Sequence, residues 1–135
     1  MRQCARKAWM MNKVIHFEIG ADNTNRIGSF YRDAFGWNII GQPTPGIDEP
    51  YLLAIAGGDD EPGISGAIMQ HHRDEQRVIA TIAVASLEDA MQRIAACGGR
   101  IVQGPDEIPG VGRHCYCEDP EGTRFGVLES QPAGG

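Results

Sequence analysis

The hexapeptide VIHFEI at residues 14–19 is rich in β-branched and aromatic residues and alternates with period two, which predicts a strand. A helical pattern over residues 23–35 follows it and ends at Gly36. Residues 78–84 (VIATIAV) again predict a strand, and a helical pattern over residues 87–97 leads to a pair of glycines. The two copies align with an offset of 63 positions. A repeat of this kind predicts a pseudo-twofold fold built from two similar modules.

The repeat is unequal at one polar position. Alternation along the first strand puts His16 and Glu18 on one face and Phe17 on the other. The offset of 63 sets His16 opposite Ile79 in the second copy. The two halves therefore differ where a functional side chain is expected.

Each copy is expected to have the order β-α-β-β-β. Further strands are expected at 37–41, 51–56 and 64–69 in the first copy and at 100–103, 113–118 and 124–129 in the second. The expected organisation is a tail (1–11), a single domain (12–130) made of module one (12–70), a linker (71–76) and module two (77–130), and a flexible C-terminus (131–135). His71 and His72 are expected to be solvated in this linker, since adjacent residues of an extended chain point apart.

Composition limits the partners of the chain. A formal net charge of −6 argues against a nucleic acid or an anionic membrane surface, and no apolar run approaches the ~20 residues that span a bilayer. Residues 1–10 lack the apolar stretch of a signal peptide.

Cys115 and Cys117 are neighbours on one expected strand and make a poor disulfide pair. Reduced thiols and a cytoplasmic location are therefore expected.

At this point the motifs resemble a known family. His16, Phe30-Tyr31 fourteen residues later, Phe35-Gly36-Trp37 and the turn Glu118-Asp119-Pro120-Glu121-Gly122 together resemble the vicinal oxygen chelate superfamily, which includes glyoxalase I, bleomycin-resistance proteins and extradiol dioxygenases. The resemblance implies an α+β fold, with two paired βαβββ modules forming a cupped mixed sheet. It also implies helices on the convex face and a ligand cavity on the concave face.

The resemblance also implies where a metal would bind. In metal-dependent members each module gives one ligand from its first strand and one from its last. Carried over by position, these are His16, Ile79 (or Ala80 if the alignment slips by one), Gly66 and Gly126. Only His16 can bind a metal, and one imidazole is too few donors. No metal cofactor is therefore expected, and a divalent metal is kept as the alternative.

The candidate catalytic residues are His16 and Glu18. An imidazole titrates near neutral pH, and Glu18 shares its face two residues away. The alternative is that His16 only lines the cavity and is hydrogen-bonded to a neighbour.

Two glycines are candidates for the ligand-binding site. Removing side chains at both Gly66 and Gly126 would enlarge the centre of the cup for an organic ligand. Alternatively, each glycine marks a strand bend or a close backbone approach.

The last hairpin is expected to pair symmetrically about its turn, with Cys115 opposite Gly126 and Cys117 opposite Arg124. All four would then face the cavity, where Arg124 could meet an anionic group; surface solvation of Arg124 and apolar packing of the cysteines are the alternatives. The ligand-binding candidates are His16, Gly66, Ile79, Arg124, Gly126, Cys115 and Trp37, the last at the cavity rim.

These residues support three hypotheses of function. The first is a glyoxalase/bleomycin-resistance-like protein that binds a small organic molecule without the family's metal. The second is a metal-dependent lyase or isomerase of glyoxalase type, or a dioxygenase, whose ligands have moved to residues such as Glu18, Glu129 or Gln70. Glu129 would need a bulge, because odd spacing puts it on the face opposite Gly126. The third is an interaction module whose cup is filled by Ile79, Ile68 and Leu128. A homodimer is expected in each case.

Overall fold

The computed structural model describes residues 12–41 and 49–130, so the predicted N-terminal tail and C-terminal end lie outside the described residues. The described chain forms two compact units. We call residues 15–79 the first module, and residues 12–14 together with 80–130 the second module.

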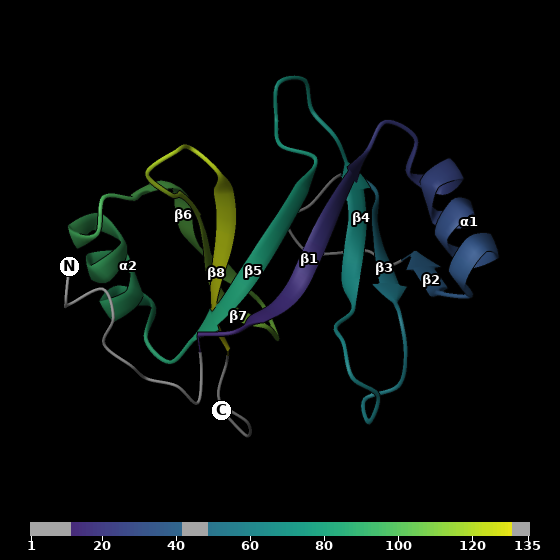
Figure 1. The fold of residues 1–135 in the computed structure, drawn as a ribbon, viewed down its shortest axis with the longest axis horizontal. Helices are drawn as coiled ribbons and strands as arrows, with labels where there is room; N and C mark the ends of the chain where they lie inside the picture. Colours follow the sequence, from purple (N-terminus) through teal and green to yellow (C-terminus); the bar gives the residue numbers. More distant parts are fainter. Residues whose placement is uncertain (1–11, 42–48, 131–135) are drawn as a thin grey trace. The chain divides into compact units, whose positions relative to one another are not determined.

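The first module is a four-stranded mixed sheet with one helix. Its elements are β1 (Val14–Ala21, apart from Val14), α1 (Thr24–Phe35), β2 (Asn38–Gly41), β3 (Tyr51–Ile55) and β4 (Gly66–Gln70) (Figure 1). The strand order is β2-β3-β4-β1. β1 and β4 are parallel, and the other neighbouring pairs are antiparallel.

The second module repeats this plan. Its elements are β5 (Val78–Val84, apart from its first two residues), α2 (Leu87–Ala96), β6 (Arg100–Ile108), β7 (Gly112–Glu118) and β8 (Arg124–Ser130) (Figure 1). The strand order is β5-β8-β7-β6, with β5 and β8 parallel. The α+β class and the two βαβββ modules are confirmed. Their pairing into one cup stays a prediction.

Both helices are found close to their predicted ranges: α1 begins one residue after the predicted start at 23, and α2 ends one residue before the predicted end at 97. The side chain of Asn23 accepts from the backbone N–H of Arg26 at 3.0 Å, and that of Ser86 accepts from Asp89 at 3.2 Å. Gly36 adopts the left-handed conformation (φ 76°) that ends α1. The helix boundaries therefore follow from local sequence.

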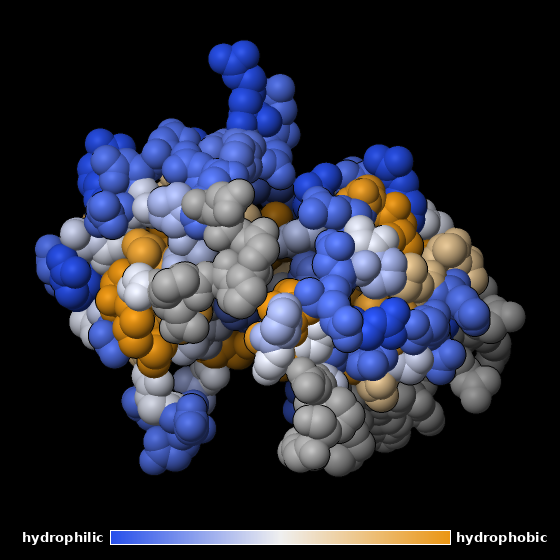
Figure 2. All heavy atoms as spheres, turned by 180° about the vertical axis from the view of Figure 1, so that it is seen from behind, coloured by the Kyte–Doolittle hydropathy of each residue, from blue (hydrophilic) through white to orange (hydrophobic). Residues whose placement is uncertain are grey.

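Each helix covers one face of its own sheet. In the first module Ile27 and Tyr31 of α1 pack on the buried Ile68, and in the second module Leu87 and Ala90 of α2 pack with Val127. Phe30 and Phe35 of α1 lie outside this core, because they are 54% and 65% exposed. Figure 2 shows apolar side chains reaching the surface in patches among hydrophilic ones.

β6 is longer than the strand predicted at 100–103. Gly104 and Pro105 act as breakers in the sequence, but the pairing with β7 continues past them through two register shifts. Cys115 and Cys117 are free thiols, as expected. Cys97 is disulfide-bonded, so the expectation of reduced thiols is wrong at that residue.

Candidate functional site

Three polar side chains gather on the face of the first sheet that points away from α1. Ile19 of β1 and Leu52 of β3 pack toward the helix. Alternation along both strands therefore turns His16, Glu18 and Tyr51 to the opposite face. The shared face predicted for His16 and Glu18 is consistent with this arrangement, because both side chains contact the Tyr51 hydroxyl.

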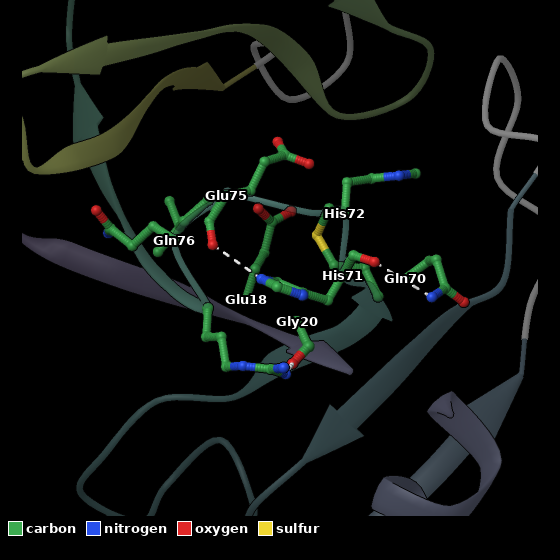
Figure 3. A pocket seen from close by; sticks show the side chains of 10 residues that line it. Glu18, Gly20, Gln70, His71, His72, Glu75 and Gln76 are labelled. Carbon is green, nitrogen blue, oxygen red and sulfur yellow. Dashed lines mark hydrogen bonds between the residues drawn. The ribbon is translucent and has the colours of Figure 1, made fainter. Parts of the chain in front are cut away.

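The three side chains form a hydrogen-bonded row. The Tyr51 hydroxyl donates to Glu18 Oε2 at 3.1 Å, and Nε2 of His16 lies 3.3 Å from the same hydroxyl oxygen. Glu18 is only 7% exposed. Figure 3 shows its side chain pointing into a small cavity. We call His16, Tyr51 and Glu18 the polar row.

Two members of the polar row, His16 and Tyr51, have shifted pKa values. Burial lowers the pKa of His16 below 6.5, and the charge of Glu18 opposes that effect. Burial also raises the pKa of Tyr51, with further contributions from the charge of Glu18 and the hydrogen bond to it. His16 is therefore neutral near pH 7 and Tyr51 keeps its proton.

The second module carries a matching pair at the same ladder positions. In the first module Glu18 pairs with Ala67, and Tyr51 pairs with Met69 two residues further along β4. In the second module Thr81 pairs with Gly126, and His114 pairs with Leu128 two residues further along β8. The offset of 63 that relates the two halves in sequence also carries Glu18 to Thr81 and Tyr51 to His114.

This register corrects the interpretation of the two glycines. Ala67 is the residue of the first module that occupies the same ladder position as Gly126 in the second module. Gly66 and Gly126 are therefore not at equivalent positions. A Cβ at Gly66 would overlap the carbonyl oxygen and ring of Phe17. Because the Phe17 ring contacts Trp37 in the core beside α1, Gly66 lies on the helix-facing side. The alternative reading, a close backbone approach, is the one that the structure supports.

Gly126 does lie on the side away from α2, but the space above it is filled. A Cβ there would meet His114 Nε2 at 2.7 Å and Thr81 Oγ1 at 2.8 Å. The glycine therefore accommodates two polar side chains that converge on it. An enlarged empty centre at this position is not found.

The register predicted for the last hairpin is wrong by one residue. Cys115 pairs with Val127 and Cys117 with Phe125, whereas Gly126 pairs with Tyr116. Both cysteines are fully buried beneath α2, with their Sγ atoms 3.6 Å apart. Cys115 is therefore a core residue, which agrees with the alternative of apolar packing. The shared hydrogen bond lowers the pKa of Cys115 and raises that of Cys117.

The remaining ligand-binding candidates lie in three different environments. Arg124 pairs with Glu118, 3.8 Å away, and is 27% exposed in its side chain. Ile79 is buried and lines the cavity beside Glu18. Trp37 stacks on Tyr31 with ring centroids 4.8 Å apart, within the core of the first module. Trp37 therefore lies on the helix side, away from His16.

The cavity beside Glu18 is too small for an organic ligand. Its volume of about 20 Å³ holds roughly one water molecule. Its lining residues are Glu18, Gly20, Met69, Gln70, His71, His72, Glu75, Gln76, Arg77 and Ile79 (Figure 3).

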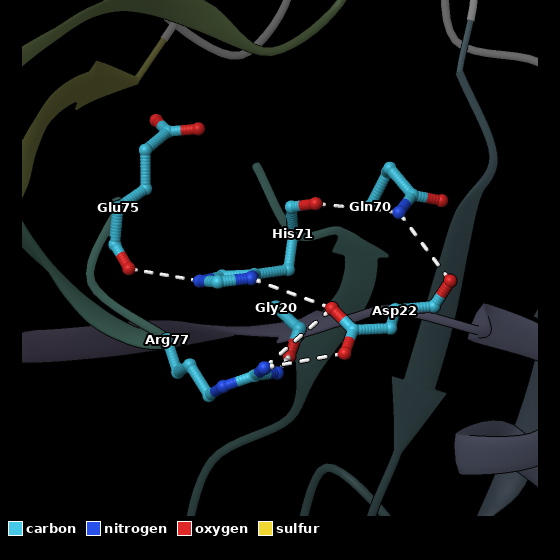
Figure 4. A network of polar contacts seen from close by, with 6 residues as sticks. All are labelled: Gly20, Asp22, Gln70, His71, Glu75 and Arg77. Carbon is cyan, nitrogen blue, oxygen red and sulfur yellow. Dashed lines mark hydrogen bonds and ion pairs between the residues drawn. The ribbon is translucent and has the colours of Figure 1, made fainter. Parts of the chain in front are cut away.

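A second network fixes the segment after β4 to the end of β1 (Figure 4). Asp22 lies 3.5 Å from His71 Nδ1 and 3.3 Å from the guanidinium of Arg77. His71 Nε2 contacts the carbonyl oxygen of Glu75 at 2.8 Å. The side chain of His71 is only 13% exposed, so the solvated linker predicted for both histidines fits His72 alone.

The residues present do not fit the metal site that the family resemblance implies. With Ala67 in place of Gly66, the four positions hold His16, Ile79, Ala67 and Gly126, of which only His16 can bind a metal. Among the described residues, no three His, Cys, Asp or Glu side chains gather to hold an ion.

Two of the three proposed substitute ligands, Glu129 and Gln70, are engaged elsewhere. Glu129 Oε1 accepts from the backbone N–H of Leu87 at 2.7 Å, so it caps α2 on the face opposite Gly126, as its odd spacing predicts. Gln70 donates to the carbonyl oxygens of Asp22 and His71.

Sequence reasoning missed two residues of these clusters, Tyr51 and His114. Each lies on a strand whose alternation was readable, since Tyr51 alternates with Leu52 and His114 with Cys115. The sequence alone does not show the strand register that brings Tyr51 next to Glu18. Applying the offset of 63 to Tyr51 would have pointed to His114.

The two βαβββ modules define the class of protein. The model of the glyoxalase/bleomycin resistance protein/dioxygenase superfamily matches residues 13–127, and the chain belongs to this superfamily. The resemblance inferred from His16, the aromatic motifs and the closing turn is thereby confirmed. In the described part of the chain, neither helix is long and apolar enough to cross a bilayer.

Two curated relatives are similar over part of their length. The chain is 33% identical over 79 residues to "Putative glyoxylase CFP32" of Mycobacterium bovis, covering 58% of this chain and 28% of that protein. It is 25% identical over 134 residues to the anthracycline biosynthesis protein DauV of Streptomyces sp. strain C5, covering 82% of this chain and 44% of that protein. The chain thus spans less than half of either relative.

Solved structures share the fold. The crystal structure of methylmalonyl-CoA epimerase from Mycobacterium tuberculosis superposes with a TM-score of 0.70 at 14% identity, covering 94% of this chain and 93% of that one. At this identity the match shows the fold alone.

Proposed function

We propose that the chain binds a small organic molecule on the first module, on the sheet face that carries the polar row, without a divalent metal. The observation that carries the proposal is the hydrogen-bonded row itself. A buried carboxylate and a half-buried imidazole are costly to place on a sheet face unless they are paired. Here they are paired through Tyr51, with the imidazole at one end of the row.

Membership of the superfamily supports this proposal. The superfamily includes bleomycin resistance proteins as well as glyoxalases and dioxygenases. The chemistry of the donor positions favours metal-free binding, because one imidazole among four positions is too few for a tight site.

A second candidate is catalysis, with His16 as general base or acid and Glu18 acting on it through Tyr51. The observation that favours it is a neutral imidazole next to a protonated phenol, which in turn donates to a buried carboxylate. A metal-dependent lyase, isomerase or dioxygenase with displaced ligands is less well supported, since Glu129 and Gln70 have structural partners.

The homodimer and the cytoplasmic location remain part of the proposal. The exposed aromatic residues Phe30 and Phe35 of α1 support a contact surface on the first module, since monomers rarely expose such patches without a use. Light scattering on the purified chain tests the dimer.

The binding proposal is tested by a fragment screen on chelator-treated, isotope-labelled protein. Neutral, cationic and anionic fragments are added, and backbone amide shifts are followed by NMR. Binding is expected to shift residues around His16, Glu18 and Tyr51, and His16→Ala is expected to abolish the effect. His72→Ala is the matched control, because this exposed histidine pairs with Glu49 at 2.9 Å in the same module. Shifts that avoid the polar row, or that survive His16→Ala, would overturn the proposal.

A further inference from the structure

The second module holds a larger cavity, of about 460 Å³, that is separate from the polar row. This volume lies within the range of roughly 300–1,000 Å³ that is typical of small-molecule sites. The cavity lies where the turn between β6 and β7 meets the end of β8, and all its described lining residues belong to the second module. They include the apolar Ile108 and Pro109 and the charged Glu107, Arg113 and Glu129.

The three charged residues of the cavity form a row across three strands. Glu107 of β6 pairs with Arg113 of β7, and Arg113 pairs in turn with Glu129 of β8. Residues that pair directly across antiparallel strands present their side chains on the same face of the sheet. One guanidinium therefore stands between two carboxylates.

A third carboxylate already pairs with this guanidinium. Glu88 of α2 places its Oε2 atom 2.7 Å from Arg113 Nη1. The hydrogen bond to Glu88 raises the pKa of Arg113, and the charges of Glu88, Glu129 and Glu107 add to this effect. Three carboxylates thus act on a single guanidinium, which leaves the group with a net negative charge.

The two carboxylates that line the cavity keep oxygens for further hydrogen bonds. Glu107 is exposed, and its side chain forms no hydrogen bond or ion pair with any residue that the structure describes. Glu129 uses Oε1 to accept from the N–H of Leu87, and within the described ranges its Oε2 has no hydrogen-bond donor. Both side chains can therefore accept hydrogen bonds from a group inside the cavity.

We propose that this cavity binds a small organic cation, an amine or guanidinium joined to an apolar group. The charged end lies at Glu107 and Glu129, and the apolar part packs on Ile108 and Pro109. A carboxylate or phosphate is disfavoured there, because the only described cation of the lining, Arg113, is already paired with Glu88. The inference goes beyond the proposed function and uses no residue of the polar row.

The ligand class is tested with three probes that share one ring and differ in charge: benzylamine, benzyl alcohol and benzoate. Each is titrated into the full chain at pH 7.5, and backbone amide shifts are followed by NMR. Benzylamine is expected to shift Glu107, Gly110 and Arg113 and to bind at least about fivefold more tightly than either other probe. Benzoate or benzyl alcohol binding as tightly as benzylamine, or the absence of benzylamine shifts at these residues, overturns the inference.

The role of the carboxylates is tested by Glu107→Gln, which keeps the shape of the side chain and removes its charge. We expect at least about a threefold loss of benzylamine affinity. Glu121→Gln is the matched control, because Glu121 is an exposed carboxylate in the turn between β7 and β8 of the same module. Unchanged affinity in Glu107→Gln, or an equal loss in both variants, contradicts the proposal. Shifts at this cavity report a separate site, so the proposed function is judged by the fragments that shift the first module.

Discussion

The hydrogen bond from Tyr51 to Glu18 joins two strands, β3 and β1, that are not neighbours in their sheet. The strand between them is β4, and it places the small, fully buried Ala67 beside Glu18. A larger residue at position 67 would occupy the face that the contact crosses. The polar row therefore depends on a position where metal-dependent relatives are expected to carry a ligand.

Loss of the Tyr51 hydroxyl should destabilise the fold. Tyr51→Phe removes a donor from the buried Glu18 carboxylate, and we expect a loss of about 1–3 kcal/mol in the free energy of unfolding, measured by urea denaturation. Tyr31→Phe is the control and should change this free energy little. Equal effects of the two substitutions would show that the hydrogen bond to Glu18 adds no stability.

His16 should make stability depend on pH in a defined window. Its pKa is lower in the folded chain than the value of 6.5 expected when unfolded, so the unfolded chain binds the proton first as the pH falls. We expect the free energy of unfolding to fall as the pH decreases below about 6.5, with a slope of at most about 1.4 kcal/mol per pH unit, and to level off below the folded pKa. Above this window His16 should contribute no pH dependence.

The matched variant for this measurement is His16→Gln, which removes the titrating group. The difference between the two unfolding profiles isolates His16 from the other histidines. A difference that grows as the pH rises, instead of as it falls, would contradict the direction of the pKa shift.

Gly66 should tolerate no side chain. Gly66→Ala places a Cβ against the carbonyl oxygen and ring of Phe17, and we expect a loss of about 1–3 kcal/mol in thermal or urea unfolding. Gly41→Ala, on strand β2, brings its Cβ to ordinary contact with Leu52 at 3.4 Å and should change stability by less than about 0.5 kcal/mol. A neutral Gly66→Ala would restore the idea that this glycine opens a cavity.

Glu129 should act as a helix cap. Glu129→Ala removes the acceptor for the N–H of Leu87 and should cost about 1 kcal/mol of stability, whereas Glu129→Gln keeps a side-chain oxygen and should cost less. Neither substitution should change fragment binding at His16. A loss of binding or of metal content in Glu129→Gln would revive the displaced-ligand hypothesis.

The fold was largely predictable because its determinants are local. The alternation around His16 and the helix-ending Gly36 each act within a few residues, and both are found as expected. The length of β6 was underestimated, because bulges carry the strand past Gly104 and Pro105 in a way that sequence alone does not indicate.

The site was less predictable because it depends on register between strands. A shift of one residue in the last hairpin moved Cys115 from the expected cavity face into the core. A shift of one residue in register also makes Ala67, instead of Gly66, the residue of the first module that is equivalent to Gly126. His16 and Glu18 were found from their own strand, whereas Tyr51 reaches them across β4.

We propose that His16, hydrogen-bonded in the polar row, holds no metal in this superfamily member. The most direct measurement is elemental analysis of the chain after growth in medium supplemented with zinc, nickel, manganese and iron. We expect far less than one equivalent of any of these metals per chain, in both the unsubstituted protein and His16→Ala. About one tightly held metal ion per chain, lost in His16→Ala, would contradict it.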